Sequence, residues 1–208
     1  MKSLLLRRRL VTAEVGKPYD AEVEYLESDG NQAIDTTEHY TRSTTKVYLR
    51  YMKFSNKKYA FGANSSDNKT SVLFCNGGSN GTTYSFRLWR YKNLYSTDSD
   101  TWQTNAEIHE LEITKSFKVD GVGRWTPGVN DTDFTSERTL FLFASHNANN
   151  AFGSSSMRVY ACKIWQNDVL VRDFIPVRKG QVGYMFDKVS GELFGNLGTV
   201  DFILGPDV

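Results

Sequence analysis

The sequence predicts an all-β protein, a two-sheet antiparallel β-sandwich or jelly roll with a short N-terminal arm. Short segments in which apolar and polar residues alternate recur along the chain, and turn residues separate them at close spacing. No helical spacing longer than a turn or two follows the arm. The pattern gives about twelve to fourteen strands. A closed barrel is the alternative, but it would have fewer long polar loops.

The clearest strand of the first half is the segment Thr45–Phe54, in which Val47, Leu49 and Tyr51 share one face. A strand whose alternate residues are apolar buries that face against a core. The other strands expected in this half cover residues 22–26, 59–62, 71–75, 84–91, 108–113 and 116–122.

The second half carries a continuous apolar segment, Leu140–Ala144, which predicts a central strand buried on both faces. Two tight hairpins are expected, at Asp120-Gly121 and at Asn167-Asp168, because their central residues tolerate positive φ, and a further turn is expected at Gly191. The residues expected to fill the core of the closing strands are Tyr160, Ile164, Phe174, Tyr184 and Phe202.

Composition limits the classes of partner. The chain has 208 residues, enough for one domain over residues 19–208, and its 25 basic residues nearly balance its 24 acidic ones. This balance argues against nucleic acid bound through a broad basic face. No apolar stretch approaches the roughly 20 residues of a membrane span. The two cysteines, Cys75 and Cys162, are expected to be reduced thiols.

Residues 1–18 form a basic arm that ends at Gly16-Lys17-Pro18, where regular structure breaks. Its short apolar run is interrupted by arginines and does not match the pattern of a secretion signal, so we expect synthesis and folding in the cytoplasm. The arm is either a frayed terminus or an attachment peptide that docks on another protein. In the second case the contact residues are Leu4, Leu5, Leu6, Arg7, Arg8 and Arg9.

Three parts of the chain resemble a known family. They are Glu24–Thr36, then Leu140–Asn147 with Met157–Trp165 and Leu170–Pro176, and then Val182–Asn196 with Asp201–Pro206. The chain is similar to the concanavalin A-like (laminin-G-like) jelly-roll domains of phage virion proteins and gut-bacterial surface proteins. The resembling residues are structural, namely turn glycines, core aromatics and the Arg172-Asp173 pair beside Phe174.

The resemblance implies binding or assembly rather than catalysis, although a fold does not by itself fix a function. We therefore expect a non-enzymatic structural or adhesion protein of a phage virion, such as a head or tail fibre or a capsid decoration protein. Its expected partners are other virion proteins, host-surface glycans and further copies of itself, with no nucleic acid and no membrane. The alternative is a glycan-binding module on a bacterial cell surface.

The expected carbohydrate site is the outward side of the segment Tyr84–Tyr91, where Arg87, Trp89 and Tyr91 alternate. Trp102 and Trp125 fall in polar loops and could join it. Aromatic faces stack on the apolar faces of sugar rings, and polar side chains fix the hydroxyls. The alternative is that these aromatic residues cover the second sheet or a subunit contact.

Glycoside hydrolysis and calcium binding are two further possibilities that the sequence supports less strongly. Glu22-x-Glu24-x-x-Glu27 resembles the acidic triplet of sandwich glycanases, so a glycoside hydrolase that uses Glu22 and Glu24 is a minor alternative. This segment is expected to be an edge strand, however, and ordinary solvated glutamates are the favoured explanation. Calcium is a second minor alternative, because paired aspartates in loops offer hard oxygen ligands; no other cofactor is expected. The candidate calcium ligands are Asp98, Asp100, Asp131 and Asp133.

Overall fold

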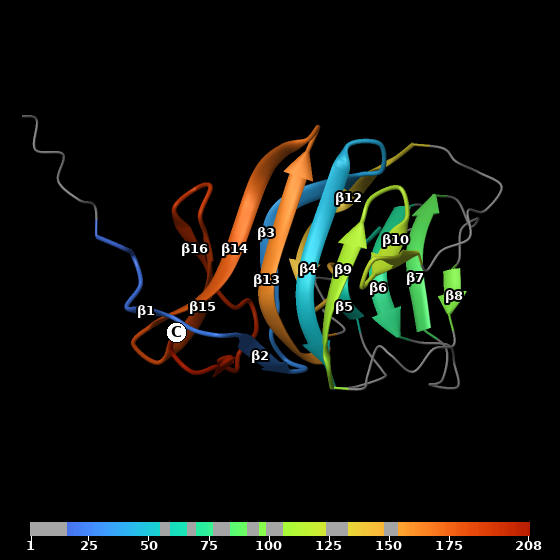
Figure 1. Cartoon of the computed structure of the whole chain (residues 1–208). Helices are drawn as coiled ribbons and strands as arrows, with labels where there is room; N and C mark the ends of the chain where they lie inside the picture. Colours follow the sequence, from blue (N-terminus) through green and yellow to red (C-terminus); the bar gives the residue numbers. More distant parts are fainter. Residues whose placement is uncertain are drawn as a thin grey trace, which may run out of the picture.

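The protein is a sandwich of two antiparallel β-sheets, as expected (Figure 1). The structure is a computed structural model that describes residues 16–54, 59–65, 70–76, 84–90, 96–98, 106–123, 133–147 and 154–208. Within these residues there are seventeen strands and no helix, hence no helix that could span a membrane. The expected number of strands was too low, because several strands contain only two or three residues.

The larger sheet has eleven strands, in the order β11-β10-β9-β4-β13-β14-β15-β16, with β1, β2 and β17 beside this path. Their bounds are β1 (Ala21–Glu22), β2 (Leu26–Asp29), β4 (Thr45–Lys53), β9 (Ile108–Ile113), β10 (Phe117–Val119), β11 (Val122–Gly123), β13 (Ser156–Gln166), β14 (Val169–Lys179), β15 (Val182–Asp187), β16 (Glu192–Phe194) and β17 (Ile203–Leu204).

The smaller sheet has six strands in the order β3-β12-β5-β6-β7-β8. Their bounds are β3 (Ile34–Thr41), β12 (Thr135–Leu142), β5 (Tyr59–Asn64), β6 (Thr70–Asn76), β7 (Tyr84–Arg90) and β8 (Ser96–Asp98). For β7 and β8 the structure describes the backbone only.

The core lies between the two sheets, and period-two alternation places residues there. Val47, Leu49 and Tyr51 of β4 are fully buried, which confirms the expected inner face of this strand. Residues 140–144 are buried throughout, as expected for this apolar segment, but the strand is shorter than expected: β12 ends at Leu142, and Phe143, with φ of 67°, lies in a bend. Burying a side chain of this size stabilises the fold by about 1.5–3 kcal/mol.

Three turns confirm the predicted positive φ angles. Asp120 and Gly121 have φ of 51° and 75°, Asn167 and Asp168 have φ of 50° and 63°, and Gly191 has φ of 76°. These angles match the right-handed twist of the strands that the turns connect.

Two further local expectations were wrong. The first strand is broken: β1 ends at Glu22 and β2 begins at Leu26, so β1 pairs with β14 whereas β2 lies between β13 and β17 and is not an edge. Tyr184 is half-buried, because β15 directs Met185 and Asp187 inward instead. The other residues expected in the core are buried.

Cys162 is a free thiol with no exposed surface, and it packs among the residues between the sheets. Burial raises its pKa well above the usual value, because a thiolate there would lack solvent. The reduced state expected for Cys162 is confirmed.

The first described residues and the last ones lie at the same side of the sandwich. Val23 forms an antiparallel bridge with Asp207, and the Val208 amide donates to the Glu22 carbonyl at 3.1 Å. In Figure 1, β1 and the C-terminus lie at the left, whereas β7 and β8 lie at the right. The residues that connect the arm to β1 therefore lie on the side of the sandwich opposite β8.

Candidate functional site

The outer face of the eleven-stranded sheet carries a group of charged and aromatic side chains that contact one another. It arises from the alternation that fills the core: because Val47, Leu49 and Tyr51 of β4 point inward, Tyr48 and Arg50 point outward. We call this group the outer-face patch. Its members are Tyr25, Glu27, Lys46, Tyr48, Arg50, Glu110, Glu112, Lys118, Arg158, Tyr160, Lys163, Trp165 and Asp173.

Strand register aligns these side chains in rows across the sheet. In one row Lys163 of β13 lies opposite Tyr48, Tyr48 lies opposite Glu112 of β9, and Glu112 lies opposite Lys118 of β10. In the next row Arg50 of β4 lies opposite Glu110 of β9. Side chains directly opposite each other on antiparallel strands come close enough to interact.

A bulge in β13 adds an aromatic ring to the patch. Val159 pairs with Tyr51 and Ala161 pairs with Arg50, so Tyr160 is an extra residue between them. The Tyr160 ring packs edge-on against Tyr25, with ring centroids 5.6 Å apart, and lies 5.5 Å from the Arg50 guanidinium. Tyr160 is thus buried, as expected, but beneath the outer face and not between the sheets.

A recess of about 260 Å³ opens in the patch between β4, β9 and the β10–β11 hairpin. Its lining residues are Tyr48, Glu110, Leu111, Glu112, Lys118 and Gly121. The volume is just below the roughly 300–1,000 Å³ of pockets that enclose drug-sized molecules. The recess is therefore large enough for one residue of a polymeric ligand, but not for a whole large ligand.

Tyr48 and Glu110 form a fixed pair at the recess. The Tyr48 hydroxyl donates to Glu110 Oε1 at 2.8 Å. Burial and the nearby carboxylate raise the pKa of Tyr48 to about 12, so the phenol keeps its proton in neutral solution. The pair offers a ligand the aromatic face of Tyr48 and the remaining lone pairs of the Glu110 carboxylate, which this hydrogen bond orients.

Glu112 lies between two lysines. Its carboxylate oxygens are 3.3 Å from Lys46 Nζ and 3.3 Å from Lys118 Nζ. Burial alone would raise the pKa of Glu112, but the two lysines outweigh that effect and lower it. A glycosidase general acid needs the opposite shift, a raised pKa that keeps the proton on the carboxyl group. The environment of Glu112 is therefore suited to binding hydroxyl groups and not to protonating a leaving group.

The far end of the patch is held by an arginine between aromatic rings. Arg158 lies 4.1 Å from the Tyr25 ring centroid and 5.2 Å from that of Phe54, and its Nε is 2.6 Å from Glu27 Oε2. Stacking and ion pairing together fix the plane of the guanidinium. Phe54 keeps 37% of its surface exposed, so the cluster presents an open aromatic edge.

The residues predicted to bind carbohydrate fall where the structure gives no side chains. Arg87 and Trp89 lie on the backbone of β7, and Tyr91, Trp102 and Trp125 lie outside the described residues. The arm residues Leu4, Leu5, Leu6, Arg7, Arg8 and Arg9 also lie outside them. These assignments remain predictions.

The four candidate calcium ligands are not seen together. Asp98 is described by its backbone alone, and Asp100 and Asp131 lie outside the described residues. Asp133 uses both carboxylate oxygens within the protein: it accepts from the amide and hydroxyl of Ser43 and from the Phe134 amide. Among the described residues no three His, Cys, Asp or Glu side chains are grouped as metal ligands.

The three glutamates of the acidic triplet lie in different surroundings. Glu22 accepts from Lys17 Nζ at 3.0 Å and from the Tyr19 hydroxyl at 2.8 Å, and these two hydrogen bonds lower its pKa. Glu27 pairs with Arg158, whereas Glu24 is exposed in the break between β1 and β2. The break separates the carboxylates that a single strand would have aligned.

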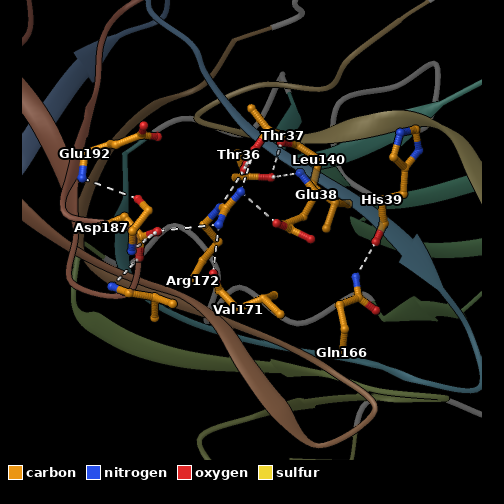
Figure 2. A network of polar contacts seen from close by, with 12 residues as sticks. Thr36, Thr37, Glu38, His39, Leu140, Gln166, Val171, Arg172, Asp187 and Glu192 are labelled. Atoms are coloured by element: carbon orange, nitrogen blue, oxygen red, sulfur yellow. Dashed lines mark hydrogen bonds and ion pairs between the residues drawn. The ribbon is translucent and has the colours of Figure 1, made fainter.

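A second polar network joins the two sheets at Arg172 of β14 (Figure 2). Its Nη2 donates to Thr37 Oγ1 at 2.8 Å and lies 2.8 Å from Glu38 Oε1, while Nη1 lies 3.5 Å from Asp187 Oδ2. Asp187 is fully buried and also accepts from the Asp173 amide. Because these groups satisfy one another across the sandwich, we interpret the network as a link between the sheets and not as a ligand site.

Sequence reasoning missed the outer-face patch, although part of the signal was present. The alternation that assigned Val47 and Leu49 to the core also assigns Lys46, Tyr48 and Arg50 to the opposite face. Their partners on β9 and β10 could not be found in this way, because strand register places Glu112 beside Tyr48. The comparisons with protein-family models and with curated proteins found no match for the chain.

Proposed function

We propose that this protein is a non-enzymatic binding module of a phage virion, a fibre or decoration protein that attaches to host-surface carbohydrate through the outer-face patch. The observation that carries the binding role is the recess at Tyr48, with an aromatic ring beside two fixed carboxylates and a lysine. Aromatic faces pack on sugar rings, and fixed polar groups orient their hydroxyls.

The architecture supports attachment at one side and binding at the other. The segment that follows the arm pairs with β14 through β1, whereas the recess lies at β9 and β10, across β4 and β13. An arm docked on a larger particle would therefore leave the recess accessible to a ligand. The resemblance to concanavalin A-like domains of virion proteins supports the same role by analogy of fold.

The binding role is tested by retention on host-surface polysaccharide. Tyr48→Ala removes the ring and the donor to Glu110, so we expect retention to be lost while the thermal melt stays cooperative. Tyr184→Ala is the matched control, because Tyr184 is a half-buried tyrosine at the opposite end of the same sheet. Unchanged retention of a folded Tyr48→Ala protein would refute the site.

The carbohydrate site predicted from the sequence is tested in parallel with Trp89→Ala. Loss of retention in this variant but not in Tyr48→Ala would place the ligand on β7 and not on the outer-face patch. Release of reducing sugars from the bound polysaccharide would contradict the non-enzymatic role.

Attachment is tested by deleting residues 2–15. We expect a soluble domain that still binds carbohydrate but no longer joins its parent particle. Normal incorporation of the truncated protein would contradict an attachment arm. Electron microscopy of the native source separates a virion protein from the alternative, a glycan-binding module on a bacterial surface.

A further inference from the structure

The positive and negative side chains of the outer-face patch nearly balance. Five are basic and four are acidic, and every lysine among them has a carboxylate close by. The basic members are Lys46, Arg50, Lys118, Arg158 and Lys163, and the acidic members are Glu27, Glu110, Glu112 and Asp173.

The pairing extends across the whole patch. The Glu112 carboxylate forms ion pairs with Lys46 Nζ and with Lys118 Nζ, each at 3.3 Å. Asp173 Oδ1 lies 3.6 Å from Lys163 Nζ. Glu27 lies 2.6 Å from Arg158. The fifth cation, Arg50, stacks on Tyr160 and lies opposite Glu110 in the strand register.

We infer that the outer-face patch is specific for an uncharged polysaccharide and that its ion pairs exclude acidic polymers. This inference rests on the proposed carbohydrate-binding function and adds the class of ligand to it. It does not concern the β7 residues predicted from the sequence.

The physical reason is that four of the five positive charges of the patch, all on described residues, already have a carboxylate partner within it, and the fifth, Arg50, stacks on Tyr160. A polyanion gains affinity by placing its charges on lysines or arginines and releasing counterions. Here it would have to displace Glu112 from two lysines and approach Glu110 as a like charge, and such juxtapositions disfavour binding. Repulsion of the wrong partner is a common route to specificity.

An uncharged sugar meets none of this repulsion. Its hydroxyls can donate to the free lone pairs of Glu110 and Glu112 and accept from Lys118, in hydrogen bonds strengthened by the charge on the protein group. The lysines need not leave Glu112, so the ligand binds without breaking the ion pairs. Tyr48 supplies the ring for stacking at the same recess.

The test measures the affinities of the full chain for a panel of uncharged polysaccharides and for alginate as the acidic probe. Wild type should bind at least one uncharged polysaccharide with little dependence on salt, and should not bind alginate. Glu112→Gln removes the shared carboxylate and leaves Lys46 and Lys118 without it. This variant should gain alginate binding, which should weaken about tenfold between about 50 and 200 mM NaCl for two lysine contacts.

Glu192→Gln is the matched control, because it removes the same charge from an exposed residue of β16, at the far edge of the sheet. It should not gain alginate binding. Cooperative melts for both variants show that the fold is retained.

The outcomes distinguish a failure of the inferred ligand specificity from a failure of the proposed carbohydrate-binding function. Salt-dependent binding of alginate by wild type would overturn the inference and leave the carbohydrate function standing. Binding of uncharged polysaccharide by wild type with no gain of alginate binding in Glu112→Gln would also overturn the role of the ion pairs. If wild type binds neither class, the proposed function fails, and the inference fails with it.

Discussion

Arg172 of β14 donates from Nε to the main-chain oxygen of Thr36 in β3, 3.2 Å away in the other sheet. Gln166 makes the same kind of contact, from Nε2 to the His39 oxygen at 2.7 Å (Figure 2). β3 is an edge strand of the six-stranded sheet, and exposed edge carbonyls invite pairing with another chain. Side chains of the larger sheet thus occupy carbonyls that a second chain would need, and Thr37, with φ of 62°, further interrupts the edge.

The first prediction concerns this link between the sheets. Arg172→Met should lower the free energy of unfolding by about 3 kcal/mol, because it leaves the buried Asp187 carboxylate without its cation. It should also increase self-association, since the Thr36 carbonyl loses its donor. Chemical denaturation and light scattering measure the two effects.

Arg178→Met is the control for this variant. Arg178 is held by Asp207, whose side chain is half exposed, so the loss should change stability only slightly. Equal effects of the two substitutions would contradict the special role of Arg172.

The second prediction concerns the hairpin turn beside the recess. Gly121→Ala should destabilise the protein by about 1 kcal/mol, because Gly121 has φ of 75° and a β-carbon is unfavourable in this conformation. Gly123→Ala is the matched control: neither glycine has an atom within 4 Å of an added β-carbon, but Gly123 lacks the positive φ. Thermal melts that shift equally would show that backbone strain is not the cause.

The third prediction uses the raised pKa of Tyr48. Its pKa rises from the ordinary 10 to about 12 on folding, so its contribution to stability is complete below pH 10 and is lost as the pH rises toward 12. A phenylalanine ring cannot ionise, so the stability advantage of wild type over Tyr48→Phe should shrink across this range. Denaturant titrations at several pH values give the difference, and a constant advantage would contradict the Tyr48–Glu110 hydrogen bond.

The fourth prediction concerns the buried thiol. In a Cys75→Ser variant the only remaining cysteine is Cys162. A thiol reagent should find no reactive group in the folded protein and one after unfolding, because burial raises the pKa of Cys162 and blocks access to it. Rapid labelling of the folded variant would show that the core opens around β13.

The sequence determined the fold class because its signals are local. Alternation assigned Val47, Leu49 and Tyr51 to the core, and residue types that tolerate positive φ located the turn at Asp120-Gly121. Each signal needs only a strand or a turn and its immediate neighbours. The same reasoning failed between Glu22 and Leu26, because pairing with β14 and then with β13 divides one apparent strand into two.

Only the tertiary structure decided where the charges meet. Glu112 comes from β9, Lys46 from β4 and Lys118 from β10, and strand register alone makes them neighbours. The bulge that turns Tyr160 onto the outer face is likewise a property of pairing between β13 and β4. An alternating sequence specifies which face a residue occupies, but not its neighbours there, because strand order and register arise from contacts across the whole chain.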